Sequence, residues 1–376
     1  MKFVFVPDSF KGTLSATEVC DILNEAREKI LPESTASIVP VADGGEGTLD
    51  VLYSLSLGEY VEVEAHNSFM EKRSSKYLLS TDGVAYIELA DCAGLPEVYD
   101  RRNPMLTTTY GVGEQIKDAV DKGAKKLIIA IGGSSTNDGG VGIACALGAK
   151  FYDVFGREFL PTGGTLSDIA DVDFEPLERY TGIEISVMCD VDTVLLGECG
   201  ASAVYGPQKG ASPDDVYLLD EGLKRLNGFF IREYGRDYST MSGGGAAGGA
   251  GAGLCAFLKA KLLPGIEVVL SAVGFDRLVE DCDIVITGEG KFDEQSFMGK
   301  VVNGVSNVTK KFNKKLVVVA GLVSDEAKRE QSKYGIVASY ATNPDKKPFD
   351  EVKMRAREDL YAVAERIFFD AKEKRI

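Results

Sequence analysis

A short apolar run, Ile284-Val285-Ile286, leads directly into Thr287-Gly288-Glu289-Gly290-Lys291-Phe292-Asp293-Glu294-Gln295-Ser296. The apolar run predicts a buried strand of a parallel sheet, and the residues after Ser296 predict a helix that reaches about Phe312. The quoted segment is then a loop at the carboxyl end of a parallel strand, where α/β folds bind their ligands. Its three acids and one lysine among glycines indicate a site for a metal ion and phosphate.

Other apolar segments predict strands that alternate with helices, at 3–6, 38–41, 316–320 and 336–340. Together with 284–287 they predict a five-stranded, flavodoxin-like parallel sheet. The long segment between the second and third of these strands begins with a β-rich stretch that includes a hairpin turn at Thr81-Asp82-Gly83. The sequence therefore predicts a two-lobe α/β fold. Residues 1–56 and 284–376 form a discontinuous flavodoxin-like domain, residues 57–283 form an inserted second α/β domain, and the active site lies in the cleft between them.

Composition narrows the possible partners. The chain has 42 Lys and Arg against 58 Asp and Glu, a net charge of −16, which argues against nucleic acid or an anionic membrane surface as a partner. Any anion must then be bound by local devices such as backbone amides, helix N-termini, a few lysines or metal ions. The single histidine, His66, argues against the usual zinc sites and against a Ser-His-Asp triad.

The seven cysteines include no C-x-x-C pair, and most stand in apolar context, which predicts free thiols in a reducing compartment. No apolar run approaches the length of a membrane span, and the apolar run after Met1-Lys2 is too short for a signal peptide. The expected location is therefore the cytoplasm.

Four predicted strand–loop–helix junctions combine glycine with hydroxyl or acidic side chains: 43–48, 132–140, 243–253 and 288–293. Such loops suit phosphoryl transfer with a divalent metal, because that chemistry depends mainly on positioning and charge stabilisation. The best candidates for Mg²⁺ ligands are Asp190, Asp192, Glu289 and Asp293. The chain contains no Walker A sequence, no G-x-G-x-x-G after the first strand and no His-Arg-Asp of protein kinases.

Each of these features also has a purely structural interpretation. The tract 243–253 is equally what a closely packed helix or a linker would show, and Asp43 could simply cap its helix. Residues 134–137 could form a capped turn, Asp190 and Asp192 could be turn formers, and Lys11 could be a solvated loop lysine. Their joint occurrence favours function.

Five segments then stand out together along the chain: Val6-Pro7-Asp8-Ser9-Phe10-Lys11-Gly12-Thr13-Leu14-Ser15-Ala16, Ala42-Asp43-Gly44-Gly45-Glu46-Gly47-Thr48, Ile131-Gly132-Gly133-Ser134-Ser135-Thr136-Asn137-Asp138-Gly139-Gly140, Tyr205-Gly206-Pro207-Gln208-Lys209-Gly210-Ala211 and Thr287-Gly288-Glu289-Gly290-Lys291-Phe292-Asp293. In this order they resemble the signature segments of the bacterial glycerate kinase family of the glyoxylate and glucarate pathways. The resemblance spans nearly the whole chain. One departure is Thr193-Val194, where the family pattern has Asn-Pro after Asp192.

The resemblance implies an ATP-dependent kinase that phosphorylates D-glycerate with Mg²⁺, at the 2-hydroxyl to give 2-phosphoglycerate, with 3-phosphorylation as the alternative. It also implies a two-lobe α/β architecture. The partner is a small-molecule substrate, and a homodimer is one option for the assembly.

We assign roles to individual residues as hypotheses, from their position at the end of a predicted strand and from the chemistry of their side chains. Lys11 and Asp190 are the expected catalytic residues, with Asp190 as general base or metal ligand near the acceptor hydroxyl. Substrate binding is expected from Asp8, Ser9, Asp43, Gly44, Ser134, Ser135 and Asn137. ATP binding is expected from Gly243, Gly244, Gly245, Gly248, Gly288 and Lys291, and Mg²⁺ binding from Asp192, Glu289 and Asp293.

Two rival classes stay open at this point. A nucleotide-dependent dehydrogenase would need the dinucleotide glycine pattern after the first strand, and Pro7-Asp8-Ser9-Phe10-Lys11-Gly12 matches it poorly. A two-lobe binding protein for small anions would share the architecture, but the free cysteines and the missing signal peptide argue against it.

Overall fold

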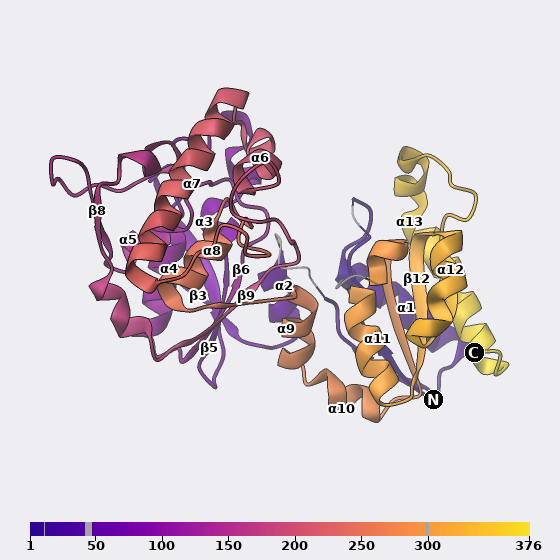
Figure 1. Ribbon diagram of the computed structural model, residues 1–376. Coiled ribbons are helices and arrows are strands. Elements are labelled where there is room, and N and C mark those ends of the chain that lie inside the picture. Colours follow the sequence, from indigo (N-terminus) through magenta and orange to yellow (C-terminus); the bar gives the residue numbers. More distant parts are fainter. Residues whose placement is uncertain (11, 42–46, 298–300) are drawn as a thin grey trace. The chain divides into compact units, whose positions relative to one another are not determined.

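The computed structural model describes residues 1–10, 12–41, 47–297 and 301–376, and the chain forms two compact units (Figure 1). The terminal unit contains Met1–Asp43 and Ile266–Ile376, and the inserted unit contains Gly44–Gly265. The sequence predicts these boundaries at 56/57 and 283/284. The structure instead assigns the segment that includes α2 (Thr48–Ser54) to the inserted unit, and α9 (Gly265–Ala272) and α10 (Phe275–Glu280) essentially to the terminal one.

A five-stranded, fully parallel sheet forms the centre of the terminal unit, in the order β13-β12-β11-β1-β2. In chain order this is the 2-1-3-4-5 arrangement of flavodoxin-like folds, so the predicted fold class is confirmed. The strands are β1 (Lys2–Phe5), β2 (Thr35–Ile38), β11 (Ile284–Phe292), β12 (Lys315–Val323) and β13 (Ile336–Ala341).

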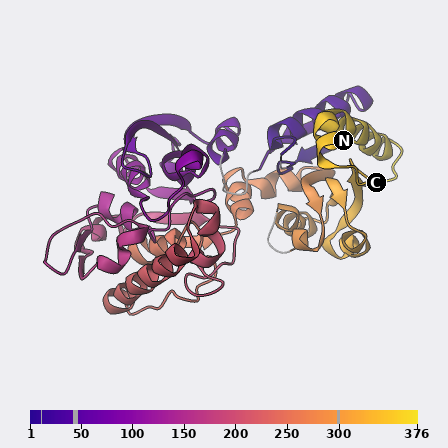
Figure 2. The same cartoon turned by 90° about the horizontal axis from the view of Figure 1, so that it is seen from above.

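Helices cover both faces of this sheet. Alternate strand residues such as Phe3, Phe5 and Ile286 pack against α1 (Ala16–Ile30) and α13 (Phe349–Lys372), which lie side by side in Figure 2. Ser15 caps α1 in the predicted capping box with Glu18. The remaining helical elements here are α11 (Val301–Lys311), α12 (Asp325–Glu330), and the 3₁₀ segments η5 (Glu294–Phe297) and η6 (Gln331–Tyr334).

Two strand predictions need correction. The predicted loop 287–296 is strand as far as Phe292, because β12 runs alongside β11 and pairs Lys291 with Leu322 and Phe292 with Val323. Only the residues from Asp293 onward turn away from the sheet. The second strand ends at Ile38 rather than at Val41, since Pro40 has no N–H to donate, although Val39 and Val41 still donate to the first strand's chain.

The inserted unit contains a six-stranded mixed sheet in the order β10-β9-β6-β5-β4-β3. Strands β10, β9, β6 and β5 are parallel, and the predicted hairpin at Asp82-Gly83 joins the antiparallel pair β4 and β5. The strands are β3 (Glu59–His66), β4 (Lys72–Leu79), β5 (Val84–Glu88), β6 (Lys126–Ala130), β9 (Glu184–Met188) and β10 (Lys261–Leu263), and a separate ribbon contains β7 (Lys150–Tyr152) and β8 (Asp171–Asp173).

One large apolar core joins this sheet to the helices around it, including the long amphipathic helix α7 (Pro213–Tyr234), which the Ser212 cap and Pro213 predict. The other helices are α3 (Leu89–Ala93), α4 (Tyr110–Asp121), α5 (Val141–Ala146), α6 (Ala201–Tyr205) and α8 (Ala250–Leu258), with 3₁₀ segments η1 (Pro96–Arg101), η2 (Gly163–Asp168), η3 (Glu175–Tyr180) and η4 (Pro207–Lys209).

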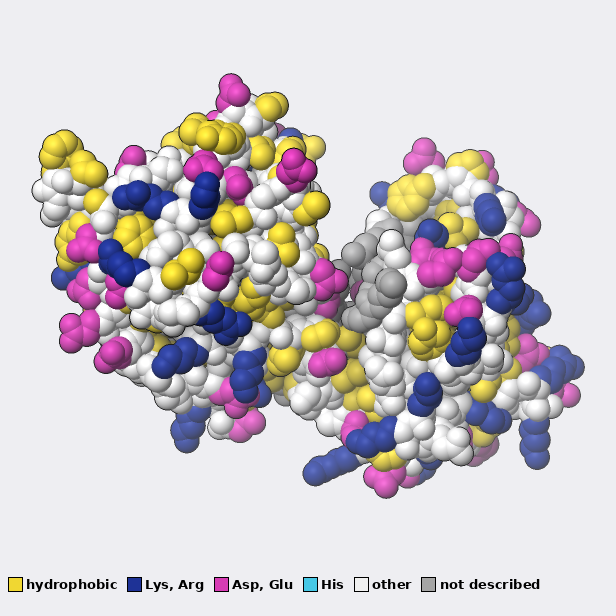
Figure 3. Space-filling model, viewed as in Figure 1, with side chains coloured by type: hydrophobic (Ala, Val, Ile, Leu, Met, Phe, Trp, Pro, Cys, Tyr) yellow, Lys and Arg dark blue, Asp and Glu magenta, His cyan; other side chains and the backbone are white. Residues whose placement is uncertain are grey.

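All seven cysteines are free, as predicted. Throughout the described ranges, no helix combines the length and the apolar character that crossing a membrane requires. On the face shown in Figure 3, acidic and basic side chains are interspersed.

The glycine tract 243–253 is buried and packs against the loop that follows β6. Gly139 donates its backbone N–H to the carbonyl of Gly248 at 3.0 Å. A Cβ on Gly248 would lie 2.1 Å from the carbonyl oxygen of Thr136, and one on Gly253 would lie 2.0 Å from that of Gly139. Glycine is therefore required here because two backbones are in direct contact.

Gly248→Ala should destabilise the protein by about 2–4 kcal/mol, because the methyl group would overlap backbone and the φ of +66° disfavours any side chain. Gly228→Ala is the matched control, since a methyl group there would meet nothing within 4 Å on an exposed helix face. It should stabilise α7 by about 0.5–1 kcal/mol. Urea unfolding measures both changes. A Gly248→Ala free energy of unfolding within about 0.5 kcal/mol of wild type would contradict the packing argument.

Candidate functional site

The loop after β6, residues 131–140, is the most polar buried segment of the inserted unit. Ser134, Ser135, Thr136, Asn137 and Asp138 are all buried, although every one of them carries a polar side chain. Buried polar groups are costly unless they are hydrogen bonded, so the partners of this loop define what it does.

Asp138 organises the amino-terminal ends of two helices. Its carboxylate accepts hydrogen bonds from the backbone N–H and the hydroxyl of Thr109, just before α4, and from the N–H groups of Gly140 and Gly142 at the start of α5. Burial raises the pKa of Asp138, and the hydrogen bonds from Thr109, Gly142 and Gly140 oppose that effect. The Asp138 carboxyl is therefore a structural group at the base of the loop.

Lys209 is the buried cation beside this loop. It ends η4 and is only 2% exposed. Its Nζ donates to Ser134 Oγ at 2.8 Å and to the carbonyl oxygen of Thr136 at 2.7 Å. In the described part of the chain, Lys209 has no ion pair within hydrogen-bonding distance. Asp138 acts on it at longer range, and its charge raises the pKa of Lys209.

The other predicted substrate residues of this loop also have partners inside the inserted unit. Asn137 Nδ2 donates to Ser202 Oγ of α6 at 3.0 Å, and Ser135 Oγ donates to the carbonyl of Ala93 at 2.9 Å. Within the described ranges, Asn137 Oδ1 and Thr136 Oγ1 are buried without a hydrogen-bond partner. The structure therefore joins Ser134 to Lys209, whereas the side chains of Ser135 and Asn137 bind Ala93 and Ser202.

Burial lowers the pKa of Lys209 to about 7, while the ordinary lysine value is about 10.4. The unfolded chain therefore binds more protons than the folded one between about pH 7 and 10, so this group makes stability rise with pH across that window. Relative to wild type, Lys209→Met should remove a slope of about 1 kcal/mol per pH unit between about pH 7.5 and 9.5.

Urea unfolding at several pH values checks this expectation. Lys224→Met is the control, because Lys224 is an exposed lysine of α7 that pairs with Glu221. Parallel stability curves for wild type and Lys209→Met over this window would show that Lys209 is not held with a lowered pKa.

The residues after β9 form a more exposed group. Asp190 and Asp192 are exposed, and Asp190 Oδ1 accepts a hydrogen bond from the N–H of Gly265 at 2.8 Å. Asp192 Oδ1 accepts from Ser242 Oγ at 2.9 Å, next to the glycine tract. Both carboxylates are thus presented at the carboxyl end of a parallel strand, as the sequence predicts.

The glycines predicted to bind ATP are themselves buried by the protein. A Cβ on Gly243 would lie 2.8 Å from Leu262, and one on Gly245 would lie 2.1 Å from the carbonyl oxygen of Val194. The N–H of Gly245 donates to the carbonyl of Thr193 at 2.9 Å. With Gly244 and Gly248 also buried, these positions are accounted for by close packing, and their contact with ATP stays a prediction.

In the terminal unit, β1 and β11 bring a second group together. The N–H of Asp8 donates to the carbonyl of Gly288 at 2.8 Å, and Ser9 donates its N–H to Asp8 Oδ1 at 2.6 Å. Asp8 and Ser9 follow the carboxyl end of β1 and therefore lie beside Gly288 and the buried Glu289 of β11.

Lys291 and Asp293 lie farther along the same strand and form an ion pair of 2.8 Å. Asp293 follows Glu289 by four residues, roughly 13 Å along an extended chain, so one Mg²⁺ would bind one of the two rather than both. Over the described ranges, no group of three or more His, Cys, Asp or Glu could hold a metal. Mg²⁺ fits these sparse carboxylates only in its usual manner, with one or two protein ligands and the rest from phosphate and water.

Lys11, Asp43 and Gly44 lie outside the described residues. The described chain resumes at Gly47, just before α2. Here Glu88 accepts hydrogen bonds from the N–H groups of Gly47 at 3.0 Å and Leu49 at 3.1 Å. The amino-terminal end of α2 is thus satisfied by a carboxylate of the protein itself. Burial raises the pKa of that carboxyl.

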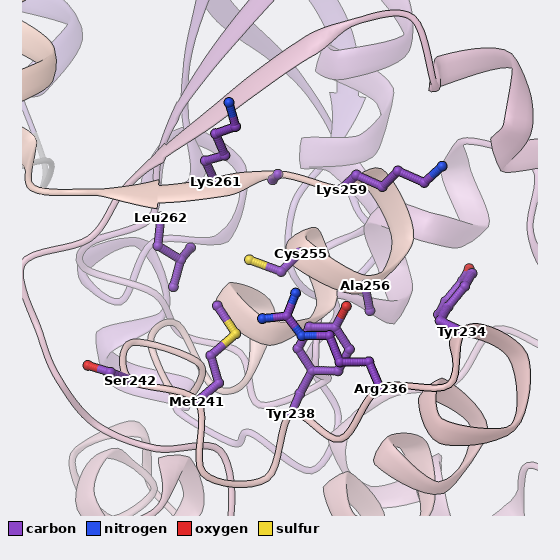
Figure 4. A pocket seen from close by; sticks show the side chains of 11 residues that line it. Tyr234, Arg236, Tyr238, Met241, Ser242, Cys255, Ala256, Lys259, Lys261 and Leu262 are labelled. Atoms are coloured by element: carbon purple, nitrogen blue, oxygen red, sulfur yellow. The ribbon is translucent and has the colours of Figure 1, made fainter.

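A cavity of about 690 Å³ lies at the edge of the inserted unit's sheet. Figure 4 shows the guanidinium of Arg236 against the ring of Tyr238, close to Cys255 and Met241, whereas Lys259 and Lys261 extend away from them. Of the predicted site residues that the structure describes, none lines it, although Ser242 does and also donates to Asp192.

The sequence model of the glycerate kinase family matches residues 3–372. The chain belongs to the glycerate kinase family. It is therefore a kinase, as its signature segments predict. It is 38% identical over 367 residues to a glycerate kinase of Halalkalibacterium halodurans, covering 97% of this chain and 96% of that one.

It is also 42% identical over 329 residues to the glycerate 2-kinase of Escherichia coli strain K12, covering 87% and 86% of the two chains. The fold agrees with a crystal structure described as glycerate kinase 2 from Salmonella typhimurium LT2, with a TM-score of 0.86 and 38% identity, over 100% of this chain and 99% of that one.

Where this chain departs from the family pattern, Thr193 and Val194 still support the loop. Thr193 Oγ1 is 2.9 Å from the hydroxyl of Tyr205, and both backbone carbonyls contact Gly245. Lys209 is the residue of the site that the predicted roles omit. In the sequence, the only indication of its importance is that it lies between Pro207 and Gly210, inside the segment 205–211 that resembles the family.

Proposed function

We propose that this protein transfers the γ-phosphoryl group of ATP to D-glycerate, at the 2-hydroxyl, with Mg²⁺ as the metal. Membership of the glycerate kinase family across residues 3–372 carries the proposal. The name of the Escherichia coli relative, glycerate 2-kinase, supports the 2-hydroxyl as acceptor. A cytoplasmic location and a homodimeric assembly belong to the same proposal.

The polar groups of each unit suit this chemistry. Phosphoryl transfer needs fixed donors and a few carboxylates more than it needs a nucleophile of the protein. The polar loop 134–138, which Lys209 contacts, supplies donors in the inserted unit, and Asp190 supplies an exposed carboxylate there. In the terminal unit, Asp8, Ser9, Glu289 and Asp293 contribute oxygen atoms near strand ends.

Asp190 is the proposed general base, or a metal ligand, for the acceptor hydroxyl, and Lys11 the proposed partner of the substrate's anionic groups. Asp192, Glu289 and Asp293 are the proposed candidates for Mg²⁺ ligands, of which Glu289 and Asp293 would not bind the same ion, and Mg²⁺ when bound would offset the charge of the phosphate oxygens. Lys291 and the glycines at 243–248 and 288 are proposed to face ATP.

A coupled assay of ATP consumption tests the function. Consumption should require both D-glycerate and Mg²⁺, and ³¹P NMR of the product should show 2-phosphoglycerate. A 3-phosphoglycerate spectrum would keep the kinase and reject the acceptor position. No ATP consumption despite tight D-glycerate binding would reject the kinase in favour of a binding protein.

Asp190→Asn should lower kcat by about 100-fold or more, because loss of a general base or a metal ligand ordinarily has that effect. The variant keeps an oxygen that can accept from Gly265, so the loop should stay in place. Asp214→Asn, in the exposed first turn of α7, is the control and should leave kcat unchanged. Turnover of Asp190→Asn within about tenfold of wild type would remove Asp190 from the mechanism.

A further inference from the structure

Lys209 has no role in the reaction as proposed so far, yet its position is energetically demanding. A buried ammonium loses hydration worth several kcal/mol, and opposite charge in direct contact usually offsets this loss. Here the contacts are a neutral hydroxyl and a neutral carbonyl, of Ser134 and Thr136. Asp138 is already engaged by Thr109, Gly140 and Gly142. When Lys209 is protonated, its direct contacts are therefore neutral, and Asp138 acts on it only at longer range.

The hydroxyl of Ser134 can pass the effect of this charge on to a ligand. Its Oγ accepts the hydrogen bond from Lys209, so the Ser134 proton must point away from Lys209. Ser134 is 6% exposed, and it forms a β-bridge with Gly94 that fixes its backbone. A hydroxyl that accepts from an ammonium is a stronger donor, because hydrogen bonds in a chain polarise one another.

The groups around Ser134 also match the chemistry of a hydroxy acid. The carboxylate of such a substrate needs donors, and its hydroxyl groups need acceptors. Ser134 provides a donor, and Asn137 Oδ1 is an acceptor that has no partner in the described part of the chain.

We propose that Lys209 is a positioning residue for the substrate carboxylate, which it attracts and orients through the hydroxyl of Ser134. This inference rests on the proposed function, because it takes D-glycerate as the substrate. Lys209 touches the loop rather than the substrate, and its charge acts one hydrogen bond away. Binding of the anion should then favour the protonated lysine, so affinity for D-glycerate should fall as the pH rises above about 7.

The test is a double-mutant cycle of Lys209→Met and Ser134→Ala, with KM for D-glycerate measured at about pH 6.5 and 8.5 and saturating ATP and Mg²⁺. Wild-type KM should rise roughly tenfold between these pH values. Each single variant should raise KM at the lower pH by about tenfold or more and flatten the pH profile. The double variant should lose little beyond the single variants, because both act through one path. Lys209→Arg, which keeps the charge, should recover part of the affinity.

Ser306→Ala is the matched control, since its hydroxyl is also buried but donates to the carbonyl of Tyr334 in the terminal unit, and it should keep the wild-type pH profile of KM. Multiplicative losses in the double variant would overturn the proposal. If Lys209→Met does not fold, Ser134→Ala alone decides, because a wild-type pH profile in that variant would also overturn it. Absence of any D-glycerate phosphorylation by wild type would instead reject the proposed function.

Discussion

Direct contact between two backbones is the constraint on which the inserted unit depends. The glycine tract lies against residues 136–140 so closely that Gly248 and Gly253 leave no space for a Cβ. The hydrogen bond from Gly139 to Gly248 fixes the relative position of the two segments. Because the loop after β6 cannot shift outward past this contact, its polar side chains stay buried, and the burial of Asp138 and Lys209 follows from it.

Two buried titratable groups then have different roles in this loop. Asp138 has its hydrogen bonds satisfied by helix N-termini, so it stabilises the fold and offers little to a ligand. Lys209 has only neutral partners, so its charge remains available to an anion. The same low-dielectric surroundings that make both charges costly to bury also strengthen their effect on neighbouring groups. In a protein of net charge −16, such a local cation is how an anionic substrate can be attracted.

The sequence was sufficient for the sheet of the terminal unit, because apolar runs such as 284–287 and 316–320 mark buried parallel strands directly. It was insufficient for the end of β11, since Gly288 and Lys291 are unusual strand residues and only pairing with β12 holds them extended. The glycine tract was ambiguous for a physical reason: the absence of Cβ serves phosphate binding and close packing equally well. The burial of Lys209 could not be predicted from sequence, because a loop lysine is ordinarily solvated. Its burial depends on contacts with Ser134 and Thr136, which lie 75 and 73 positions earlier in the chain.

The two units hold different kinds of polar groups. The inserted unit holds its donors in a packed polar loop, whose side chains lose little further freedom when a substrate binds. The terminal unit presents oxygen atoms at the ends of β1 and β11, where Asp8 is fixed by Gly288 and Lys291 pairs with Asp293. The lysine of this pair is exposed, whereas the Asp293 carboxylate is mostly buried and also accepts a hydrogen bond from the N–H of Gln295. Buried donors that are already positioned suit recognition of a substrate, whereas the candidate carboxylates of the terminal unit are buried at Glu289 and half-buried at Asp8 and Asp293.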